Sequence, residues 1–126
     1  MATGVSDSLA EAINDAIFNG VDFSFGTAYL ALMTTASTAS AFGTECTGGS
    51  YARAAISAAP AAGNSVASDA AILFANMPAC TVAGVSIVDT AAGAPTRWLF
   101  IDGLSRSVSA GENLVVNVGD LTNALA

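Results

Sequence analysis

The stretch Thr27–Thr34 constrains the fold most, because it is apolar on both sides when it is read as a strand. Its sequence is TAYLALMT, and alternate side chains of an extended chain point to opposite faces. Both sets are apolar: Ala28, Leu30 and Leu32 on one face, and Tyr29, Ala31 and Met33 on the other. Such a strand has to be covered on both sides. We therefore expect a strand that is covered on both faces, with an N-terminal helix as one candidate cover.

Short apolar runs separated by Gly, Ser, Ala and Pro follow this stretch. They predict further strands at Tyr51–Ser57, Ala71–Asn76, Val82–Asp89, Thr96–Asp102, Leu114–Val118 and Leu121–Leu125. The segment Ala110–Asn113 reads as a hairpin loop before the fifth of these strands. Several short strands with turn signals between them predict a mostly-β fold, an antiparallel β-sandwich or jelly-roll-like domain.

One amphipathic α-helix is expected within residues 6–20. Ser8 and Glu11 have the spacing of a capping box. In this motif, the side chain of each residue accepts a hydrogen bond from the backbone N–H of the other. Apolar residues then recur at steps of three and four: Leu9, Ala12, Ile13, Ala16 and Ile17. Gly20 follows as a C-cap. We expect a single domain over residues 1–126, with this helix followed by the β-sandwich over 27–125.

The charge of the chain excludes several classes of partner. The formal net charge is −7, with three basic residues and ten acidic ones. Nucleic-acid affinity requires many basic groups against phosphates, so we expect no nucleic-acid partner. The longest apolar runs are too short for a membrane span, which needs about 20 residues. Charged residues make up only 10% and hydrophobic residues 53%, which is typical of a surface covered by other subunits and predicts permanent assembly.

The residue types that are missing exclude most catalytic chemistry. The chain has no histidine and no lysine, so a Ser-His-Asp triad, a Cys-His dyad, a Schiff base and histidine-ligated zinc are all excluded. Asp89 and Asp102 end two predicted strands and form the best candidate carboxylate pair. Aspartates at strand ends are far more often turn formers. We therefore expect no enzyme, no cofactor, no metal site and no catalytic residue.

The two cysteines, Cys46 and Cys80, are far apart in the sequence and form no CxxC pair. This spacing encodes neither a zinc site nor a thioredoxin-like motif. A disulfide between them and two buried free thiols are the remaining alternatives, and the free thiols are favoured.

Residues 44–53, TECTGGSYAR, combine a Gly-Gly turn with a tyrosine and one of the three arginines. Tyr51 and Arg53 are two residues apart and so share a strand face. We expect the Tyr51 ring to be buried with its hydroxyl bonded. The Arg53 guanidinium should be held by carboxylates or carbonyls of its own chain or of a neighbour's. With Trp98, these residues are candidate structural or intersubunit anchors; a ligand-binding role for Arg53 is the weaker alternative.

The order of motifs along nearly the whole chain resembles that of a family of small tailed-bacteriophage virion proteins, described as tail-fibre or capsid-decoration proteins. The motifs are the helix closing at Asn19-Gly20, TAYLALMTT, Thr44-Glu45 leading into GGSYARAAI, Ala70–Phe74, Val82–Asp89 with its DTAAG turn, Trp98-Leu99-Phe100, and the closing SVSAGENLVVNVGDLTNAL. The resemblance implies a structural component of a virion that is assembled in the host cytoplasm.

Within that class, the first hypothesis is a capsid decoration or cement protein. It would form a homo-oligomer, a trimer by expectation, over major capsid protein subunits and stabilise their lattice. A tail-fibre or baseplate component is the alternative in the same class. A host-glycan-binding module is a third hypothesis, for which Trp98 and two tyrosines offer a small aromatic platform.

Overall fold

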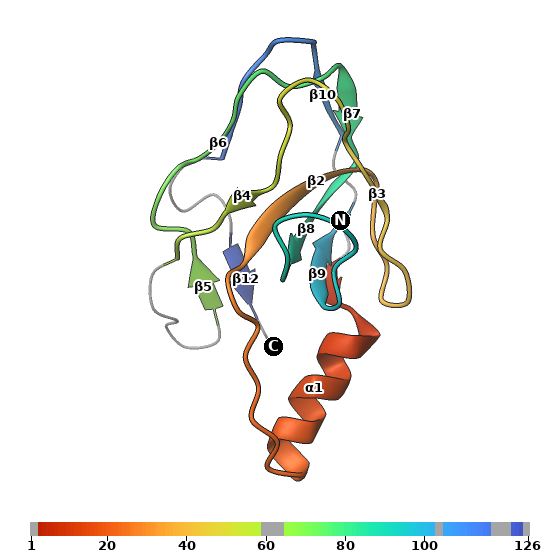
Figure 1. Ribbon diagram of the computed structural model, residues 1–126, viewed down its shortest axis with the longest axis vertical. Helices are drawn as coiled ribbons and strands as arrows, with labels where there is room; N and C mark the ends of the chain where they lie inside the picture. Colours follow the sequence, from red (N-terminus) through yellow and green to blue (C-terminus); the bar gives the residue numbers. More distant parts are fainter. Residues whose placement is uncertain (1–2, 59–64, 103–104, 117–121, 125–126) are drawn as a thin grey trace.

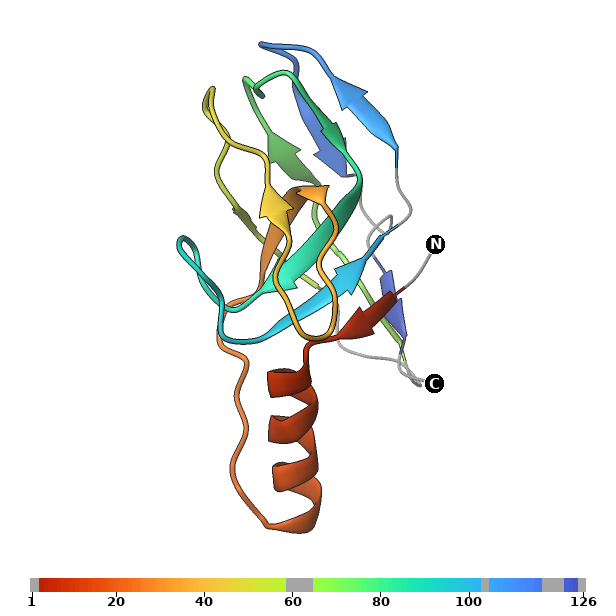
Figure 2. The same ribbon diagram turned by 90° about the vertical axis from the view of Figure 1, so that its right-hand side faces the viewer.

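The structure is a computed structural model, and it describes residues 3–58, 65–102, 105–116 and 122–124. The strands gather in one part of the molecule, and the helix α1 (Asp7–Phe18) extends away from them (Figure 1). The chain returns beside the helix through residues 19–28 before it enters the sheet (Figure 2). The predicted class is confirmed: the protein is mostly β, with antiparallel sheets and one N-terminal helix, and the described strands form no closed barrel.

The main sheet has the strand order β1-β9-β8-β2-β3, with β4 also paired to β2, and every pair is antiparallel. Its strands are β1 (Thr3–Val5), β2 (Tyr29–Thr35), β3 (Thr44–Glu45), β4 (Ala54–Ala55), β8 (Gly84–Val88) and β9 (Trp98–Ile101). The strand predicted from TAYLALMT is β2, and it has neighbours along both edges. It is therefore an inner strand of the main sheet.

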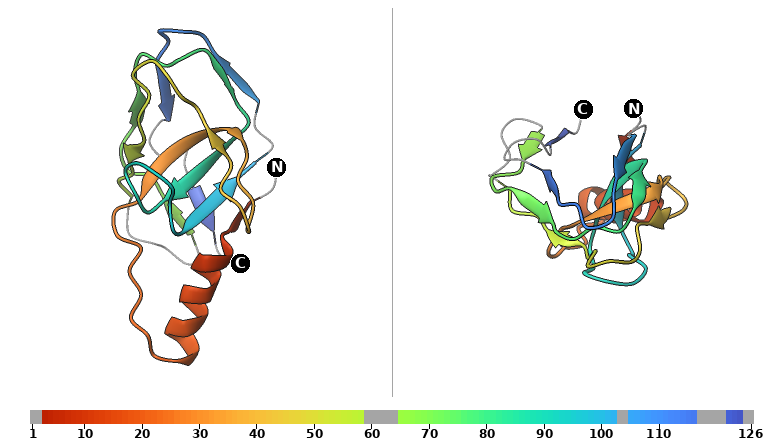
Figure 3. Two further views of the ribbon diagram at one scale, coloured as in Figure 1. Left: turned by 45° about the vertical axis from the view of Figure 1, so that its right-hand side comes forward. Right: turned by 90° about the horizontal axis from the view of Figure 1, so that it is seen from above.

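The remaining described strands form three two-stranded antiparallel sheets. They are β5 (Ser65–Ala67), β6 (Ile72–Phe74), β7 (Cys80–Val82), β10 (Arg106–Val108), β11 (Leu114–Val116) and β12 (Thr122–Ala124). β7 pairs with β10, β6 with β11 and β5 with β12. The two pairs made by β6, β7, β10 and β11 are called the ribbon. Figure 3 shows β6, β7, β10 and β11 at the end of the molecule opposite to α1.

The hairpin loop expected at Ala110–Asn113 is wrong. The register of β7 with β10, continued without a shift, leads to the register of β6 with β11. Between the two pairs, the N–H of Gly111 donates to the carbonyl of Met77 over 2.8 Å. The strands on either side of this segment therefore pair with another part of the chain and not with each other. The turn-like residues interrupt the ribbon between β10 and β11, and they do not form a hairpin.

Two apolar cores lie on the two faces of β2. Leu30 and Leu32 belong to the larger core, which the ribbon completes with residues such as Phe74. Ala31 and Met33 belong to the second core, with Val88 and Trp98 among its members. The four β2 side chains are 0–1% exposed. The two-sided burial predicted from the sequence is confirmed.

The helix does not supply either cover. Leu9 is the buried side chain of α1, whereas Ile17 is 66% exposed and Phe18 79% exposed. The second face of β2 is covered instead by Trp98 from β9 and by Phe42 from the segment between β2 and β3. Only the first turn of α1 reaches the strands, because its axis leads away from them (Figure 2).

The N-cap of the helix is Ser6 and not Ser8, so the predicted capping box is wrong. The Ser6 hydroxyl oxygen accepts from the N–H of Leu9 over 3.2 Å and from the N–H of Trp98 over 3.1 Å. Ser8 donates its hydroxyl to the carbonyl of Thr96. Both serines thus fix the start of α1 to the strand β9 and its approach, which explains why the helix begins so close to β1.

Candidate functional site

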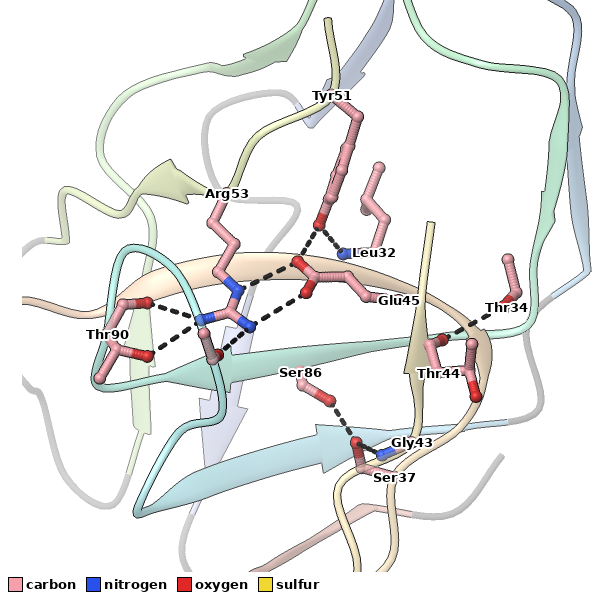
Figure 4. Close-up of polar contacts among 11 residues, drawn as sticks. Leu32, Thr34, Ser37, Gly43, Thr44, Glu45, Tyr51, Arg53, Ser86 and Thr90 are labelled. Carbon is pink, nitrogen blue, oxygen red and sulfur yellow. Dashed lines mark hydrogen bonds and ion pairs between the residues drawn. The ribbon is translucent and has the colours of Figure 1, made fainter. Parts of the chain in front are cut away.

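Glu45, Tyr51 and Arg53 form a buried polar cluster beside the main sheet (Figure 4). Glu45 ends β3, and Arg53 directly precedes β4. Both short strands pair with β2, which pairs with β8 as well. The chain therefore leaves β2, returns along one edge of it as β3, loops out through residues 46–53 and rejoins the same edge as β4. This path brings the carboxylate and the guanidinium together.

The Gly48-Gly49 turn lies in the loop between β3 and β4 and lets the chain rejoin β2. Both glycines have positive φ, +101° and +55°, which L side chains rarely adopt. A Cβ on Gly49 would lie 2.7 Å from the carbonyl oxygen of Asn76. The turn is thus fixed both by its backbone angles and by its close contact with the ribbon, as the Gly-Gly pair had predicted.

Arg53 donates all five of its N–H groups within the chain. Nε and Nη2 bind the two carboxylate oxygens of Glu45, each over 3.0 Å, in a bidentate ion pair. Nη1 donates to the carbonyl and the hydroxyl of Thr90 over 3.1 and 3.0 Å, and Nη2 also donates to the carbonyl of Gly93 over 2.7 Å. The Arg53 side chain is 5% exposed and that of Glu45 20%. Such a guanidinium has no N–H left for a ligand.

Tyr51 completes the cluster from above the carboxylate. Its hydroxyl donates to Oε2 of Glu45 over 2.6 Å and accepts from the N–H of Leu32 over 2.9 Å. Its ring stacks on that of Phe74 with centroids 5.9 Å apart. Burial, helped by the hydrogen bond to Glu45, raises the pKa of Tyr51 far above its ordinary value. The hydroxyl therefore remains a neutral donor.

The sequence placed Tyr51 and Arg53 on one face and predicted the kinds of group that hold the arginine, but it did not name Glu45. A signal was present, because Glu45 is the only acidic residue between Asp22 and Asp69. No comparable signal marked the carbonyls of Thr90 and Gly93, which a turn between β8 and β9 supplies.

Trp98 lies outside the cluster but is joined to it through Phe42. The Phe42 ring packs edge-on against Trp98 at a centroid distance of 5.7 Å, and the Arg53 guanidinium carbon lies 5.6 Å from the same ring. The Trp98 indole N–H donates to the carbonyl of Thr38 over 2.9 Å. Ser37, which accepts from the N–H of Gly43, closes the loop that carries Phe42 (Figure 4). No pattern in the sequence singled out Phe42.

Among the described residues, Asp89 of the candidate carboxylate pair makes a structural contact. Asp89 accepts from the N–H of Thr96 over 3.2 Å, as a turn-forming aspartate does. Within the described residues, no three of the Cys, Asp and Glu side chains gather as metal ligands would. An open hollow of about 350 Å³ borders Glu45 and Arg53, but their charges are already paired with each other.

Cys46 and Cys80 are brought together although 34 positions separate them. Their sulfur atoms lie 2.8 Å apart, and both are free thiols in the structure. Cys46 is buried and Cys80 is half-buried. Separately, none of the helices described in the structure has the length and apolar character needed to cross a membrane.

The sequence model of one protein family matches residues 4–124, and that family is described as podophage GP4 fiber I protein gp80. The chain belongs to this family. The match includes α1, the main sheet and the Glu45–Tyr51–Arg53 cluster. No curated protein matches the chain.

Membership makes the protein a structural, non-enzymatic fibre component of a phage virion. The predicted resemblance to tailed-phage virion proteins is confirmed, and so is the expectation that the protein is not an enzyme. The first hypothesis, a capsid decoration protein, is less well supported than its tail-fibre alternative.

Proposed function

We propose that the protein is a tail-fibre component that attaches to another virion protein through its N-terminal arm. The arm consists of α1 and the returning segment 19–28. Its free end carries four exposed apolar side chains: Ile17 at 66%, Phe18 at 79%, Val21 at 53% and Phe23 at 37%. This exposed apolar end is the observation that carries the proposal, because such groups on a protruding element are typical of an interaction site.

The stability of the helix supports the same role. An isolated helix of 12 residues is marginal in water, and helices in proteins owe most of their stability to packing of the apolar face. In α1 only Leu9 is buried. A partner that covers the remaining apolar stripe would stabilise the helix, and the cost of ordering it is already partly met by the contacts of Ser6 and Leu9.

Charge indicates the chemistry of the partner. The arm carries Asp7, Glu11, Asp15 and Asp22 and no basic residue. The fitting surface is therefore apolar and bordered by Lys or Arg. A second copy of this chain does not meet that description, because its net charge is −7. Of its three arginines, Arg53 is bound to Glu45 and Arg97 lies over the ring of Phe23, 5.3 Å from its centroid.

Contacts between copies are assigned to a different surface. Leu73 and Val115 are direct cross-strand neighbours on the ribbon, and they are 55% and 46% exposed. This pair bears no charge, so copies of the chain can meet there without repulsion between their acidic arms. A homotrimer joined at the ribbon leaves each arm free for the other virion protein.

Two other hypotheses are less well supported. A glycan-binding module presents exposed aromatic rings, whereas Trp98 is 9% exposed and the hydroxyl of Tyr51 is bound to Glu45. Capsid decoration requires that the arm's basic, apolar partner be the major capsid protein. The test below therefore separates heads from tails.

The experiment mixes the purified chain with two preparations from phage that lack it: tailed particles, and heads without tails. Co-sedimentation with tailed particles alone is expected. The double variant Ile17→Ser/Phe18→Ser should lose this binding, while the matched ribbon variant Leu73→Ser/Val115→Ser should keep it and shift the mass in solution toward the monomer. Binding to heads without tails would overturn the tail-fibre proposal in favour of decoration. Retained binding by the arm variant would overturn the role of the arm.

A further inference from the structure

The two cysteines join separate parts of the β structure. Cys46 directly follows β3, and its N–H donates to the carbonyl of Leu32 in β2 over 2.9 Å. Cys80 begins β7, where it pairs with Val108 of β10. Cys46 is a member of the larger apolar core, and Cys80 packs against that core. A bond between them would connect the edge of the main sheet to the ribbon.

The distance between the two sulfur atoms is too short for an ordinary contact. Unbonded carbon atoms are best placed about 3.5–4.0 Å apart, and sulfur is larger than carbon. The two sulfur atoms lie 2.8 Å apart, nearer than that separation and approaching the disulfide bond length of about 2.05 Å. A backbone hydrogen bond joins Cys46 to Leu32 of β2, and the pairing of β7 with β10 holds Cys80, so the approach is set by the fold.

We propose that Cys46 and Cys80 are a site of oxidative cross-linking, and that they form an intrachain disulfide once the protein leaves the reducing cytoplasm of the host. Bacterial cytoplasm keeps thiols reduced, whereas extracellular conditions allow disulfides to persist. A virion component passes from the first environment to the second. The proposal concerns the folded chain and holds whether or not the chain is part of a tail fibre.

The reaction needs an oxidant, and a low-molecular-weight disulfide can supply it. The thiol of Cys80 gives up its proton to solvent, and its sulfur attacks one sulfur of the small disulfide. A bond forms between Cys80 and that sulfur, the bond within the small disulfide breaks, and the leaving thiolate takes a proton. Cys80 now carries a mixed disulfide.

Cys46 resolves the mixed disulfide. Its thiol loses a proton and its sulfur attacks that of Cys80, so the bond between the two protein sulfurs forms and the second small thiol leaves with a proton. Two protein thiols are oxidised, and one small disulfide is reduced to two small thiols. No atom or electron is left over.

The surroundings of the two residues fix this order. Cys46 is 2% exposed, and burial, together with the hydrogen bond to Cys80, raises its pKa to about 12. A buried thiol of that kind does not react first with a molecule from solvent. Cys80 is half-buried and is therefore the entry point. Cys46 lies within contact of the sulfur that it must attack.

The test begins with the chain purified under reductant and then incubated with oxidised glutathione. We expect the intact mass to fall by that of two hydrogen atoms, and a digest to contain the peptides of Cys46 and Cys80 joined. The melting temperature should rise by roughly 5–15 °C, because a cross-link between residues so far apart in sequence restricts the unfolded chain. Added reductant should reverse both changes.

Two single variants test the order and guard against a folding failure. Cys46→Ala leaves Cys80 without a partner, so it should retain one glutathione and gain no thermal stability from the oxidant. Cys80→Ser, which alters the more exposed residue, should remain folded and unmodified by glutathione. Two free thiols in the oxidant-treated folded chain, or two glutathione adducts on it, would overturn the proposal. Failure of particle binding would leave this result unaffected.

Discussion

The Glu45–Tyr51–Arg53 cluster and the N-terminal arm differ in whether their side chains find partners within the chain. In the cluster, the carboxylate, the hydroxyl and all five guanidinium N–H groups are bonded within the chain. In the arm, large apolar groups such as Phe18 face solvent, and four acidic residues occur without a basic one. The first region is complete in the single chain. The second becomes complete only when a partner covers it.

Whether a side chain has a partner within the chain distinguishes structural from functional residues better than its chemical reactivity does. A charged cluster attracts attention as a ligand site, but a buried ion pair is tolerated only when its remaining bonding groups are satisfied. Arg53 meets that condition without a ligand. The arm contains no unusual chemistry, yet its apolar end is what an isolated chain would not be expected to expose.

The largest expected loss of stability comes from a change in the Glu45–Tyr51–Arg53 cluster. Arg53→Ala removes the ion-pair partner of Glu45, whose side chain is 20% exposed, and should lower the free energy of unfolding by up to about 3–5 kcal/mol, which is the cost for a fully buried pair. Arg106→Ala is the matched control, because Arg106 is exposed and its loss should change stability by no more than about 0.5 kcal/mol. Thermal and urea denaturation measure both. Equal melting temperatures for Arg53→Ala and the wild type would mean that the cluster does not anchor the fold.

The next largest loss of stability is expected within α1, where it distinguishes the part that packs on the strands from the exposed part. Leu9→Ala should lower the free energy of unfolding by about 2–5 kcal/mol, because Leu9 is 4% exposed. Ile17→Ala removes a similar side chain two turns later and should change it by about 0.5 kcal/mol or less. Urea denaturation of the isolated chain measures the pair. A large loss from Ile17→Ala would show that the arm folds back onto the strands in solution.

The two regions also differ in how far the sequence predicted them. The burial of both faces of β2 followed from TAYLALMT, because a strand with apolar residues on both faces has to be covered on both sides. Tyr51 and Arg53 were found because a Gly-Gly turn and a spacing of two residues are local features, although both residues precede β4 and do not lie within it as predicted. Glu45, Thr90 and Phe42 were missed, since contacts between distant segments depend on how the strands are ordered.

For the arm, the sequence predicted the amphipathic helix but not its lack of cover. The stripe from Leu9 to Ile17 has the same spacing whether it packs on its own sheet or on another protein. The capping error has a similar origin. Ser8 has the capping pattern, but Ser6 is held by the N–H of Trp98, which is 92 residues away in the sequence. No local pattern reports such a contact.

A smaller effect should come from the Tyr51 hydroxyl. Tyr51→Phe leaves the N–H of Leu32 without its acceptor and should lower the free energy of unfolding by about 1–3 kcal/mol. The effect should depend on pH. Burial raises the pKa of Tyr51 above its ordinary value of 10.0, so the folded state retains the proton that the unfolded state begins to lose there. The advantage of the wild type over Tyr51→Phe should be full below pH 10 and shrink as the pH rises above it.

Urea denaturation of both proteins in a series from about pH 8 to pH 11 measures this difference, and the comparison cancels the other groups that titrate in the same range. A difference in the free energy of unfolding that stays constant through pH 10 would mean that the Tyr51 hydroxyl is exposed to solvent. Tyr51 would then not belong to the buried cluster.

The smallest expected effect on the isolated chain is at the end of the arm. Phe18→Ser replaces a side chain that is 79% exposed, so the free energy of unfolding should change by about 0.5 kcal/mol or less. Amide hydrogen exchange sharpens the point, because it reports local opening separately from global unfolding. The last turns of α1 should exchange much faster than β2 in the free chain and become protected when tailed particles bind it. Slow exchange throughout α1 in the free chain would mean that the helix is stable without a partner. The arm would then be stabilised within the single chain, as the cluster is.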